Sequence, residues 1–211
     1  MKKALFLLAA LAAWNTQAVL YTTNWTVNAS VPDNNLSGWA DSRTVGVSGM
    51  LITPGSLLVS LNLSGGWNGD LYAYLVHDTG FAVLLDRVGY TGSGYGYGTA
   101  GMNVWLTDEA GVGNIETVPA PYSANALSPY SRSGYAGSLA SFDNLDPSGT
   151  WTLFIADLSG GGVTTVVDWG LQMDIVAVPE VESWIAAALA GAFGAFWLNR
   201  AIWRGVKRPE E

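Results

Sequence analysis

The stretch Val163-Thr-Thr-Val-Val-Asp-Trp-Gly-Leu-Gln-Met-Asp-Ile175 decides the fold of this chain. From Val167 onward, apolar residues alternate strictly with polar or small ones. A strand places successive side chains on opposite faces, so this pattern predicts a strand with one buried face. A helix would scatter the same apolar residues around its axis. The protein is therefore expected to be built on a sheet.

Further runs of the same kind precede this stretch, each bounded by turn residues: Leu57–Leu63, Asp70–Val76, Phe81–Leu85, Met102–Leu106 and Trp151–Ala156. The second and third are joined by residues 77–80 and predict a hairpin. Two stretches, 89–101 and 116–138, are expected to be long loops. With 26 glycines and no helical pattern away from the termini, the sequence predicts an all-β, antiparallel, jelly-roll-like β-sandwich.

The N-terminus reads as an export signal. Lys2 and Lys3 precede an apolar run at 4–13, and Thr16-Gln17-Ala18 offers small residues at the positions that signal peptidase reads. We expect cleavage after Ala18. The first segment, 1–18, is therefore expected to be a helical signal peptide.

The C-terminus reads as a membrane-spanning helix. Residues 184–198 carry no charge, and 201–203 extend the run past Arg200. Fifteen helical residues span about 22 Å, so the longer segment of about 184–203 approaches the ~30 Å hydrocarbon core. Basic residues follow it: Arg200, Arg204, Lys207 and Arg208. This asymmetry predicts a cytoplasmic C-terminus and an external domain. A core helix is the alternative, but a helix apolar on all sides needs complete burial.

Charge and cysteine content narrow the function classes. Between Val19 and Val178 there are thirteen acidic and three basic residues, a net charge of −10. Such a surface repels phosphate backbones, so no nucleic-acid partner is expected. The chain has no cysteine, and an exported domain without disulfides depends on its core or on bound ions.

The C-terminal layout resembles a known sorting signal. Val178-Pro179-Glu180, then an apolar helix, then a basic cluster, is similar to the PEP-CTERM signal, although Val181 stands where that family usually has proline. The resemblance implies an exosortase-like enzyme in the inner membrane of a Gram-negative bacterium, and a sorting tail at 178–211. It also implies a membrane-anchored precursor that ends at the cell surface or in the extracellular matrix.

The body, 19–177, resembles a second family. Ser148-Gly-Thr-Trp-Thr-Leu153 followed by Asp168-Trp-Gly-Leu171, with the hairpin that begins at Gly69, is similar to the proprotein convertase P domain. P domains are jelly-roll sandwiches that accompany subtilisin-like proteases without carrying their catalytic residues.

No catalytic set is visible, so no enzyme is expected. The only histidine, His77, falls in the predicted hairpin turn beside Asp78, and no Gly-x-Ser-x-Gly motif occurs. Cysteine nucleophiles are absent, and a zinc site lacks ligands. Two pairs of carboxylates lie close together in the sequence: Asp143 with Asp146, and Asp108 with Glu109. Glycoside hydrolysis requires two carboxyl groups that face each other across the bond, and closeness in sequence does not show that they do.

Two binding sites are candidates. Calcium prefers several oxygen ligands, and aspartates lie at strand ends or glycine turns: Asp70, Asp78, Asp157 and Asp168. P domains are often associated with calcium, so Ca²⁺ is the one cofactor considered. Aromatic residues in predicted loops are candidates for stacking on sugars: Trp39, Trp67, Tyr95 and Tyr97, with Tyr90 nearby. Without a ligand, hydrogen bonding to the backbone of turns explains the aspartates, and packing against the core explains the aromatic residues.

Together these features predict a non-enzymatic, exported surface or matrix protein. Signal peptidase, an exosortase-like enzyme and, transiently, the inner membrane are its expected partners. The first alternative is a calcium- or glycan-binding module, with exopolysaccharide as its partner. The second is an accessory of a subtilisin-like protease, in which proteolysis belongs to the associated enzyme.

Overall fold

The alternating stretch forms strand β11 (Thr164–Ala177), an inner strand of the larger sheet. Its side chains at Trp169, Leu171 and Met173 are fully buried, as the pattern predicts. A register shift between Val166 and Asp168 reverses the alternation before that point, so Val166 is buried in place of Val167. β11 pairs antiparallel with β1 (Val19–Ser30) on one side and β4 (Leu58–Gly65) on the other, and its last residues also pair with β3 (Met50–Ile52).

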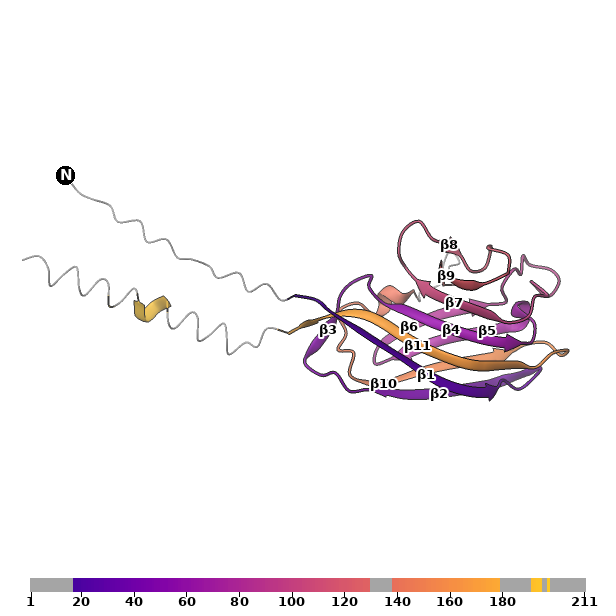
Figure 1. Ribbon diagram of the computed structural model, residues 1–211, viewed down its shortest axis with the longest axis horizontal. Helices are drawn as coiled ribbons and strands as arrows, with labels where there is room; N and C mark the ends of the chain where they lie inside the picture. The colour runs from indigo at the N-terminus through magenta and orange to yellow at the C-terminus, as the bar shows by residue number, and fades with distance from the viewer. Residues whose placement is uncertain (1–16, 130–137, 179–190, 195–196, 198–211) are drawn as a thin grey trace, which may run out of the picture. The chain divides into compact units, whose positions relative to one another are not determined.

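Two sheets make a sandwich (Figure 1). The larger has the strand order β1-β11-β4-β7-β9-β8, with β3 beside β11, and the smaller has the order β2-β10-β5-β6. The remaining strands are β2 (Asn35–Val45), β5 (Leu71–His77), β6 (Gly80–Asp86), β7 (Met102–Thr107), β8 (Gly113–Asn114), β9 (Ser123–Ser128) and β10 (Gly149–Asp157). Two short 3-10 helices, η1 (Asn68–Asp70) and η2 (Leu139–Phe142), complete the elements. An all-β sandwich is therefore confirmed.

The computed structural model describes residues 17–129, 138–178, 191–194 and 197. Residues 17–177 form one unit, and 1–16 with 178–211 form another. The predicted signal segment lies almost entirely outside the described residues, as does most of the predicted helix at 184–203, of which 191–194 and 197 are helical. Among the described residues, no helix is both long and apolar enough to cross a membrane.

The six strands expected from the sequence are all present, within two residues of the expected bounds at each end. The hairpin of β5 and β6 closes through Asp78 and Thr79, a tighter link than the expected 77–80. The 89–101 segment is a loop as expected, between β6 and β7. The second expected loop was wrong in part, because 116–138 contains β9, while 130–137 lie outside the described residues.

The expectation of a purely antiparallel sandwich was wrong at one edge. β9 runs parallel to both β7 and β8. The chain leaves β7 at Thr107 and returns to its side only at Ser123, after a long connection. A return of that length lets the strand enter from the same end as β7, whereas a tight hairpin would force it to run antiparallel.

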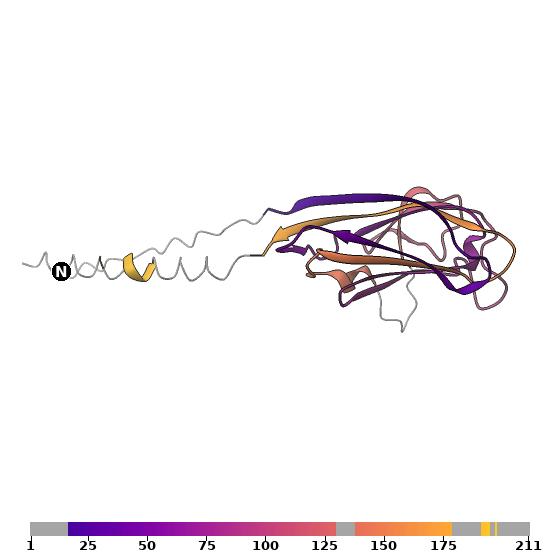
Figure 2. The ribbon, with the colours of Figure 1, turned by 90° about the horizontal axis from the view of Figure 1, so that it is seen from below.

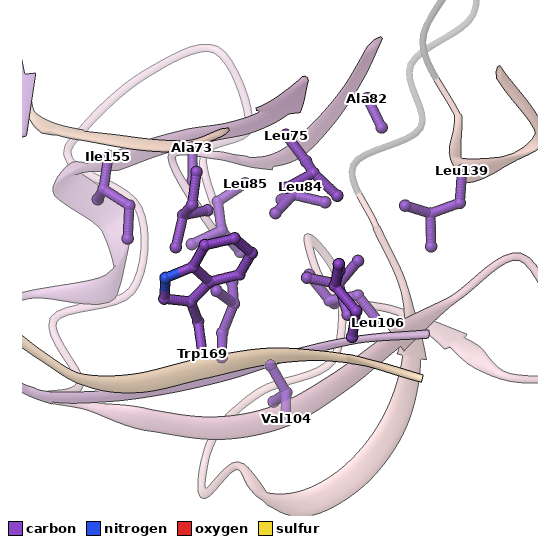
Figure 3. Close-up of a cluster of buried hydrophobic side chains, with 14 of the residues drawn as sticks. Ala73, Leu75, Ala82, Leu84, Leu85, Val104, Leu106, Leu139, Ile155 and Trp169 are labelled. Carbon is purple, nitrogen blue, oxygen red and sulfur yellow. The ribbon is translucent and has the colours of Figure 1, made fainter. Parts of the chain in front are cut away.

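The core lies between the sheets. Trp169 rises from β11 toward Ala73, Leu85 and Ile155 of the smaller sheet (Figure 3). Trp169 also pairs with Trp25 of β1 at a ring-centroid distance of 4.6 Å. The largest fully buried side chains are Trp151, Trp169 and Phe142. Full burial of a large apolar side chain is worth roughly 1.5–3 kcal/mol, so these rings fix the spacing of the sheets.

His77 does not lie on a surface turn, so that expectation was wrong. It is the last residue of β5 and is only 2% exposed. Its ring stacks on Trp151 with centroids 4.1 Å apart, and its two nitrogens lie 3.0 and 2.8 Å from the carbonyl oxygens of Thr150 and Asp146. The imidazole therefore holds β5 against β10 and the 146–150 segment.

The two ends of the sandwich differ. Val19 pairs with Ile175 and Ser30 with Thr165, so the chain enters and leaves the sandwich at the same end. Figure 2 shows β1 running along β11 over this whole length. The connection from β10 to β11 lies at the opposite end, on the right of Figure 1.

Candidate functional site

Four connections meet at the end of the sandwich away from its chain ends, and we call this region the loop end. They are residues 31–34, 66–70, 87–101 and 158–163. Backbone hydrogen bonds join them: Leu158 donates to the carbonyl oxygen of Asp70 at 2.8 Å, and Gly69 donates to that of Tyr97 at 2.9 Å. The backbones at Gly69 and Tyr97 can lie this close because Gly69 has no side chain: a Cβ there would lie 2.6 Å from the nitrogen of Tyr97.

Asp70 and Asp157 lie together at the loop end. Asp157 closes β10 opposite Leu71, the residue after Asp70. Asp70 is 2% exposed and Asp157 is 0% exposed. Among the described residues, Asp70 Oδ1 and Asp157 Oδ2 are buried without a hydrogen-bond partner. A buried carboxylate oxygen without a partner is costly, because it loses its hydration and gains nothing in return.

Asp33 supplies a third carboxylate from the β1–β2 turn. Both of its oxygens lie 3.3 Å from the backbone nitrogen of Gly161, which donates to them. The charge of Asp33 acts on both Asp70 and Asp157 and raises the pKa of each. Sequence reasoning missed Asp33; the signal was its position in a turn directly after β1, but that strand was not predicted.

Burial is the main cause that raises the pKa of both Asp70 and Asp157. For Asp157, the repulsion from Asp70 adds to this effect. Opposing causes are weaker: the charge of Arg87 and a hydrogen bond from the Ser159 side chain lower the pKa of Asp70. The Ser159 backbone nitrogen donates to Asp157 Oδ1 at 3.2 Å. Neither carboxylate forms a salt bridge with a described residue, although the charge of Arg87 acts on Asp70.

Arg87 faces this site from the edge. Its Nε donates to the carbonyl oxygen of Gly69 at 3.4 Å, and its guanidinium carbon lies 4.4 Å from the centre of the Tyr90 ring. Arg87 forms no salt bridge with Asp70. The only salt bridge between described residues joins Arg43 to Asp41, elsewhere on the domain.

The arrangement suits a hard cation. Ca²⁺ takes oxygen ligands from carboxylates, carbonyls and hydroxyls, and Asp33, Asp70, Asp157 and Ser159 bring such groups together. Among the described residues, no group of three or more His, Cys, Asp or Glu side chains is placed to hold a metal ion. The loop end therefore offers a pair of buried carboxylates, with Asp33 in the neighbouring turn.

The other two predicted calcium ligands lie elsewhere. Asp78 occupies the β5–β6 turn, and the length of β5 separates it from Asp70. Asp168 lies on the outer face of the larger sheet, where it accepts hydrogen bonds from Asn24 at 3.2 Å and Asn62 at 2.7 Å. Of the four aspartates, the structure brings together only Asp70 and Asp157.

The four predicted aromatic residues do not share one surface. Trp39 is partly buried against the core. Tyr97 packs on Gly89, and its hydroxyl donates to the carbonyl oxygen of Thr117 at 3.4 Å. Trp67 and Tyr95 are 42% and 72% exposed.

A cavity of about 660 Å³ opens beside the loop end, on the outer face of β4 and β7. Its walls come from three segments: Asn62, Leu63, Ser64, Gly65, Thr99, Ala100, Gly101, Met102, Asn103, Ala120, Pro121 and Tyr122. Sequence reasoning did not find this cavity, since its lining comes from separated segments, two of which were read as loops.

The predicted sorting residues are at the limit of the described chain. Val178 is described and half-exposed, whereas Pro179 and Glu180 lie outside the described residues. The basic tail residues Arg200, Arg204, Lys207 and Arg208 also lie outside them.

Comparisons with known proteins give no family. No family model matches the chain, and no curated protein matches it. Two solved structures are similar: the serine protease of Aeromonas sobria in complex with its chaperone, and the serine protease of Aeromonas sobria alone. The first is 14% identical with a TM-score of 0.45, and covers 77% of this chain and 28% of that one. The second is 13% identical with a TM-score of 0.44, and covers 76% and 27%. This chain therefore spans less than a third of either protease chain, and neither comparison assigns it to a family.

Proposed function

We propose that this chain is an exported, non-enzymatic β-sandwich module that binds Ca²⁺ at its loop end. One observation carries the binding function: Asp70 and Asp157 are almost fully buried side by side, and each has a carboxylate oxygen without a partner. A divalent cation supplies an ion-pair partner for both groups, neither of which forms a salt bridge with a described residue. Asp33 and the Ser159 hydroxyl provide further oxygens at the same place.

Binding of Ca²⁺ fits an exported protein without disulfides. The chain contains no cysteine, so a metal ion takes the place of a covalent cross-link between its loops. The ion joins the β1–β2 turn, the β4–β5 turn and the end of β10. The Leu158 N–H already donates to the Asp70 carbonyl oxygen, and the Gly161 N–H to Asp33, so the ion would add to existing hydrogen bonds at this end.

A melting experiment tests the site. Full-length protein in mild detergent is unfolded by heat with millimolar Ca²⁺ or with chelator, and Ca²⁺ is expected to raise the Tm, because a ligand of the folded form alone stabilises it. Asp157→Asn is expected to abolish the increase. Asp78→Asn and Asp168→Asn are matched controls that keep it. No increase in the unsubstituted protein, or an equal increase in Asp157→Asn, contradicts the proposal.

Export and sorting form the second part of the proposal and rest on the sequence. Signal peptidase removes 1–18, the apolar segment at about 184–203 holds the precursor in the inner membrane, and an exosortase-like enzyme processes the tail near Val178-Pro179-Glu180. The product reaches the cell surface or matrix. The mass of the mature protein from an exosortase-bearing Gram-negative host tests this, and a product that retains residues beyond the 178–180 motif contradicts it.

The P-domain resemblance supports a narrower version of the same proposal, in which the sandwich is a P-domain-like jelly roll and accompanies a subtilisin-like protease. The motif residues that carry it, Trp151 and Trp169, are both fully buried. Co-purification of such a protease with the tagged chain is the expected result. Its absence from the native envelope contradicts this accessory role and leaves the cation site untouched.

A further inference from the structure

The cavity beside the loop end combines polar groups with an apolar wall. Asn62, Asn103, Ser64 and Thr99 contribute amides and hydroxyls, whereas Pro121 with its neighbours contributes apolar surface. None of the residues that line this cavity carries a charge. Its volume of about 660 Å³ is within the usual range for small-molecule sites, roughly 300–1,000 Å³.

These groups match a neutral sugar more closely than an ion. Amides and hydroxyls both donate and accept hydrogen bonds, as sugar hydroxyls do. An anionic ligand would find no cation among the lining residues. A purely apolar ligand would leave the amide of Asn103 without a partner, which costs free energy. The amide of Asn62 is also held in place, since it donates to Asp168 at 2.7 Å.

One turn connects the cavity to the cation site. Asn68, which is 0% exposed, donates from its side chain to the carbonyl oxygen of Gly101 at 2.9 Å and to Thr99 Oγ1 at 3.2 Å. Its backbone nitrogen donates to the Thr99 carbonyl oxygen at 2.9 Å. Asn68 and Asp70 belong to the same 3-10 turn. The turn that carries a cation ligand therefore also holds one wall of the cavity.

We propose that this cavity binds a neutral polysaccharide chain, and that Ca²⁺ bound at Asp70 and Asp157 is required because it fixes the turn that forms the cavity wall. The inference rests on the proposed cation site. The position of the cavity agrees with such a ligand: it borders the loop end, opposite to the end where Val19 and Ala177 lie.

A glycan array tests the inference. Full-length protein in mild detergent is applied to immobilised neutral and acidic glycans, with Ca²⁺ or with chelator. We expect binding to neutral glycans that chelator abolishes. Asn62→Ala and Asn103→Ala are expected to weaken it about tenfold or more, equivalent to about 1.4 kcal/mol. Asn24→Ala is the matched control, because Asn24 also donates to Asp168 but does not line the cavity.

The outcomes separate the two proposals. A Ca²⁺-dependent increase in Tm without binding to any neutral glycan overturns this inference and leaves the cation site standing. Neutral-glycan binding that persists in chelator, or that Asn62→Ala and Asn24→Ala weaken equally, also overturns it. Selective binding to acidic glycans does the same. If Asn62→Ala retains the Ca²⁺-dependent increase in Tm, its loss of glycan binding is not a folding defect and supports the inference.

Discussion

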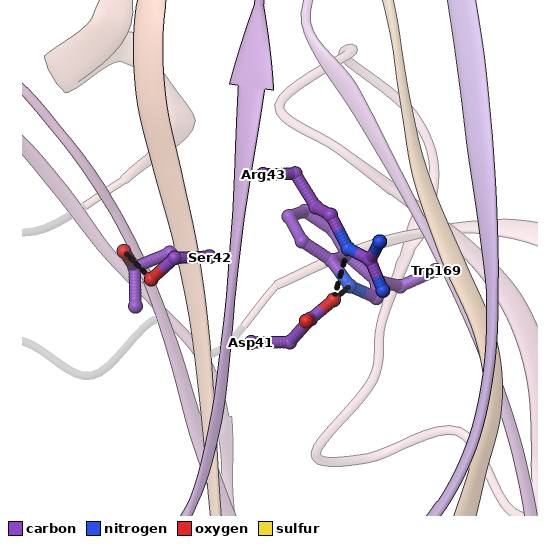
Figure 4. A network of polar contacts seen from close by, with 5 residues as sticks. Asp41, Ser42, Arg43 and Trp169 are labelled. Carbon is purple, nitrogen blue, oxygen red and sulfur yellow. Dashed lines mark hydrogen bonds and ion pairs between the residues drawn. The ribbon is translucent and has the colours of Figure 1, made fainter.

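The carboxylate of Asp41 accepts a hydrogen bond from the indole nitrogen of Trp169 at 2.8 Å (Figure 4). Asp41 belongs to β2 of the smaller sheet and Trp169 to β11 of the larger one, so this bond joins the two layers. The same oxygen, Oδ2, accepts from Arg43 Nε at 2.7 Å. Arg43 compensates the charge of Asp41 next to the fully buried indole.

Asp41→Ala is expected to destabilise the protein. The substitution leaves the buried indole N–H of Trp169 without an acceptor, which costs roughly 1–3 kcal/mol. Denaturant melts measure the loss. Ser42→Ala is the control: Ser42 is the next residue, and its exposed hydroxyl pairs only with Thr152, at 2.8 Å. Equal stability of Asp41→Ala and the unsubstituted protein would contradict a role for this bond between the sheets.

His77→Phe tests the polar contacts of the buried imidazole. Phenylalanine retains a ring against Trp151, whereas the carbonyl oxygens of Thr150 and Asp146 lose the donor. An imidazole with one N–H donates to one of these carbonyl oxygens at a time, so the loss of that hydrogen bond predicts a decrease of about 1 kcal/mol in the free energy of unfolding. Thr79→Ala, in the adjacent turn, is the control. A variant as stable as this control would show that stacking alone holds the segment.

Stability is expected to fall as pH rises from about 4.5 to about 7. Burial raises the pKa of Glu116 from 4.5 to about 7, although its carboxylate accepts a hydrogen bond from the Asp86 backbone nitrogen at 3.1 Å. Between these values the folded state keeps a proton that the unfolded state has lost, so rising pH favours unfolding. The full effect is on the order of 3 kcal/mol. Glu116→Gln should flatten the pH dependence of the Tm. An unchanged profile would contradict the conclusion that the raised pKa of Glu116 causes this dependence.

The stabilisation by Ca²⁺ should be larger near pH 7 than near pH 4. Burial raises the pKa values of Asp70 and Asp157 above 3.8, so protons compete with the cation for both carboxylates in acid. The pKa of Asp146 shifts in the opposite direction, because hydrogen bonds from Ser148 lower it. The contribution of Asp146 to folding stability is therefore lost only below pH 3.8. Melts at both pH values, with Ca²⁺ or chelator, measure the difference. An equal increase in Tm at both would contradict ligation by these aspartates.

Gly69→Ala is expected to weaken the attachment of the 87–101 loop to the sandwich. The added methyl group would lie 2.6 Å from the Tyr97 nitrogen, within the backbone contact that holds the loop. A Cβ at Gly98, in the same loop, has no heavy atom within 4 Å, so Gly98→Ala is the matched control. Limited proteolysis should cut the loop faster in Gly69→Ala only. Equal rates in the two variants would show that the loop does not depend on this approach.

The strands that could be predicted from the sequence are those with apolar residues on one face and polar or small residues on the other, or with a continuous run of apolar residues. In β11 every second residue is large and apolar, and β4, β5 and β10 are rich in buried aliphatic residues. β1 was missed although its inward face carries Tyr21, Trp25 and Val27, because Thr23 and Ala29 interrupt the apolar pattern and the whole face is only half-buried. β2 was missed because polar residues such as Asp41 and Arg43 replace its apolar face.

The candidate site was predictable only in part. Asp70 and Asp157 were identified from their positions beside glycine turns, and they do meet in space. The pairing of β10 with β5 brings them together, and no local pattern encodes that register. The amides of Asn62 and Asn103 carried no signal of their own, because their importance comes from neighbours that are distant in the chain. Asp33 was missed because β1, the strand before its turn, was not predicted.

The pairing of Val19 with Ile175 has a mechanical consequence. The first and last strands lie antiparallel and side by side, so a force that pulls their outer ends apart acts across the ladder of hydrogen bonds between them. Under a force perpendicular to the strands, the hydrogen bonds of the ladder break one after another. Under a force along the strands, many of them must break at the same time. The domain should therefore unfold at low force when it is stretched between residues 19 and 177. It should resist more strongly when one attachment point is at the loop end and the other at residue 177, since β11 is then pulled along its length.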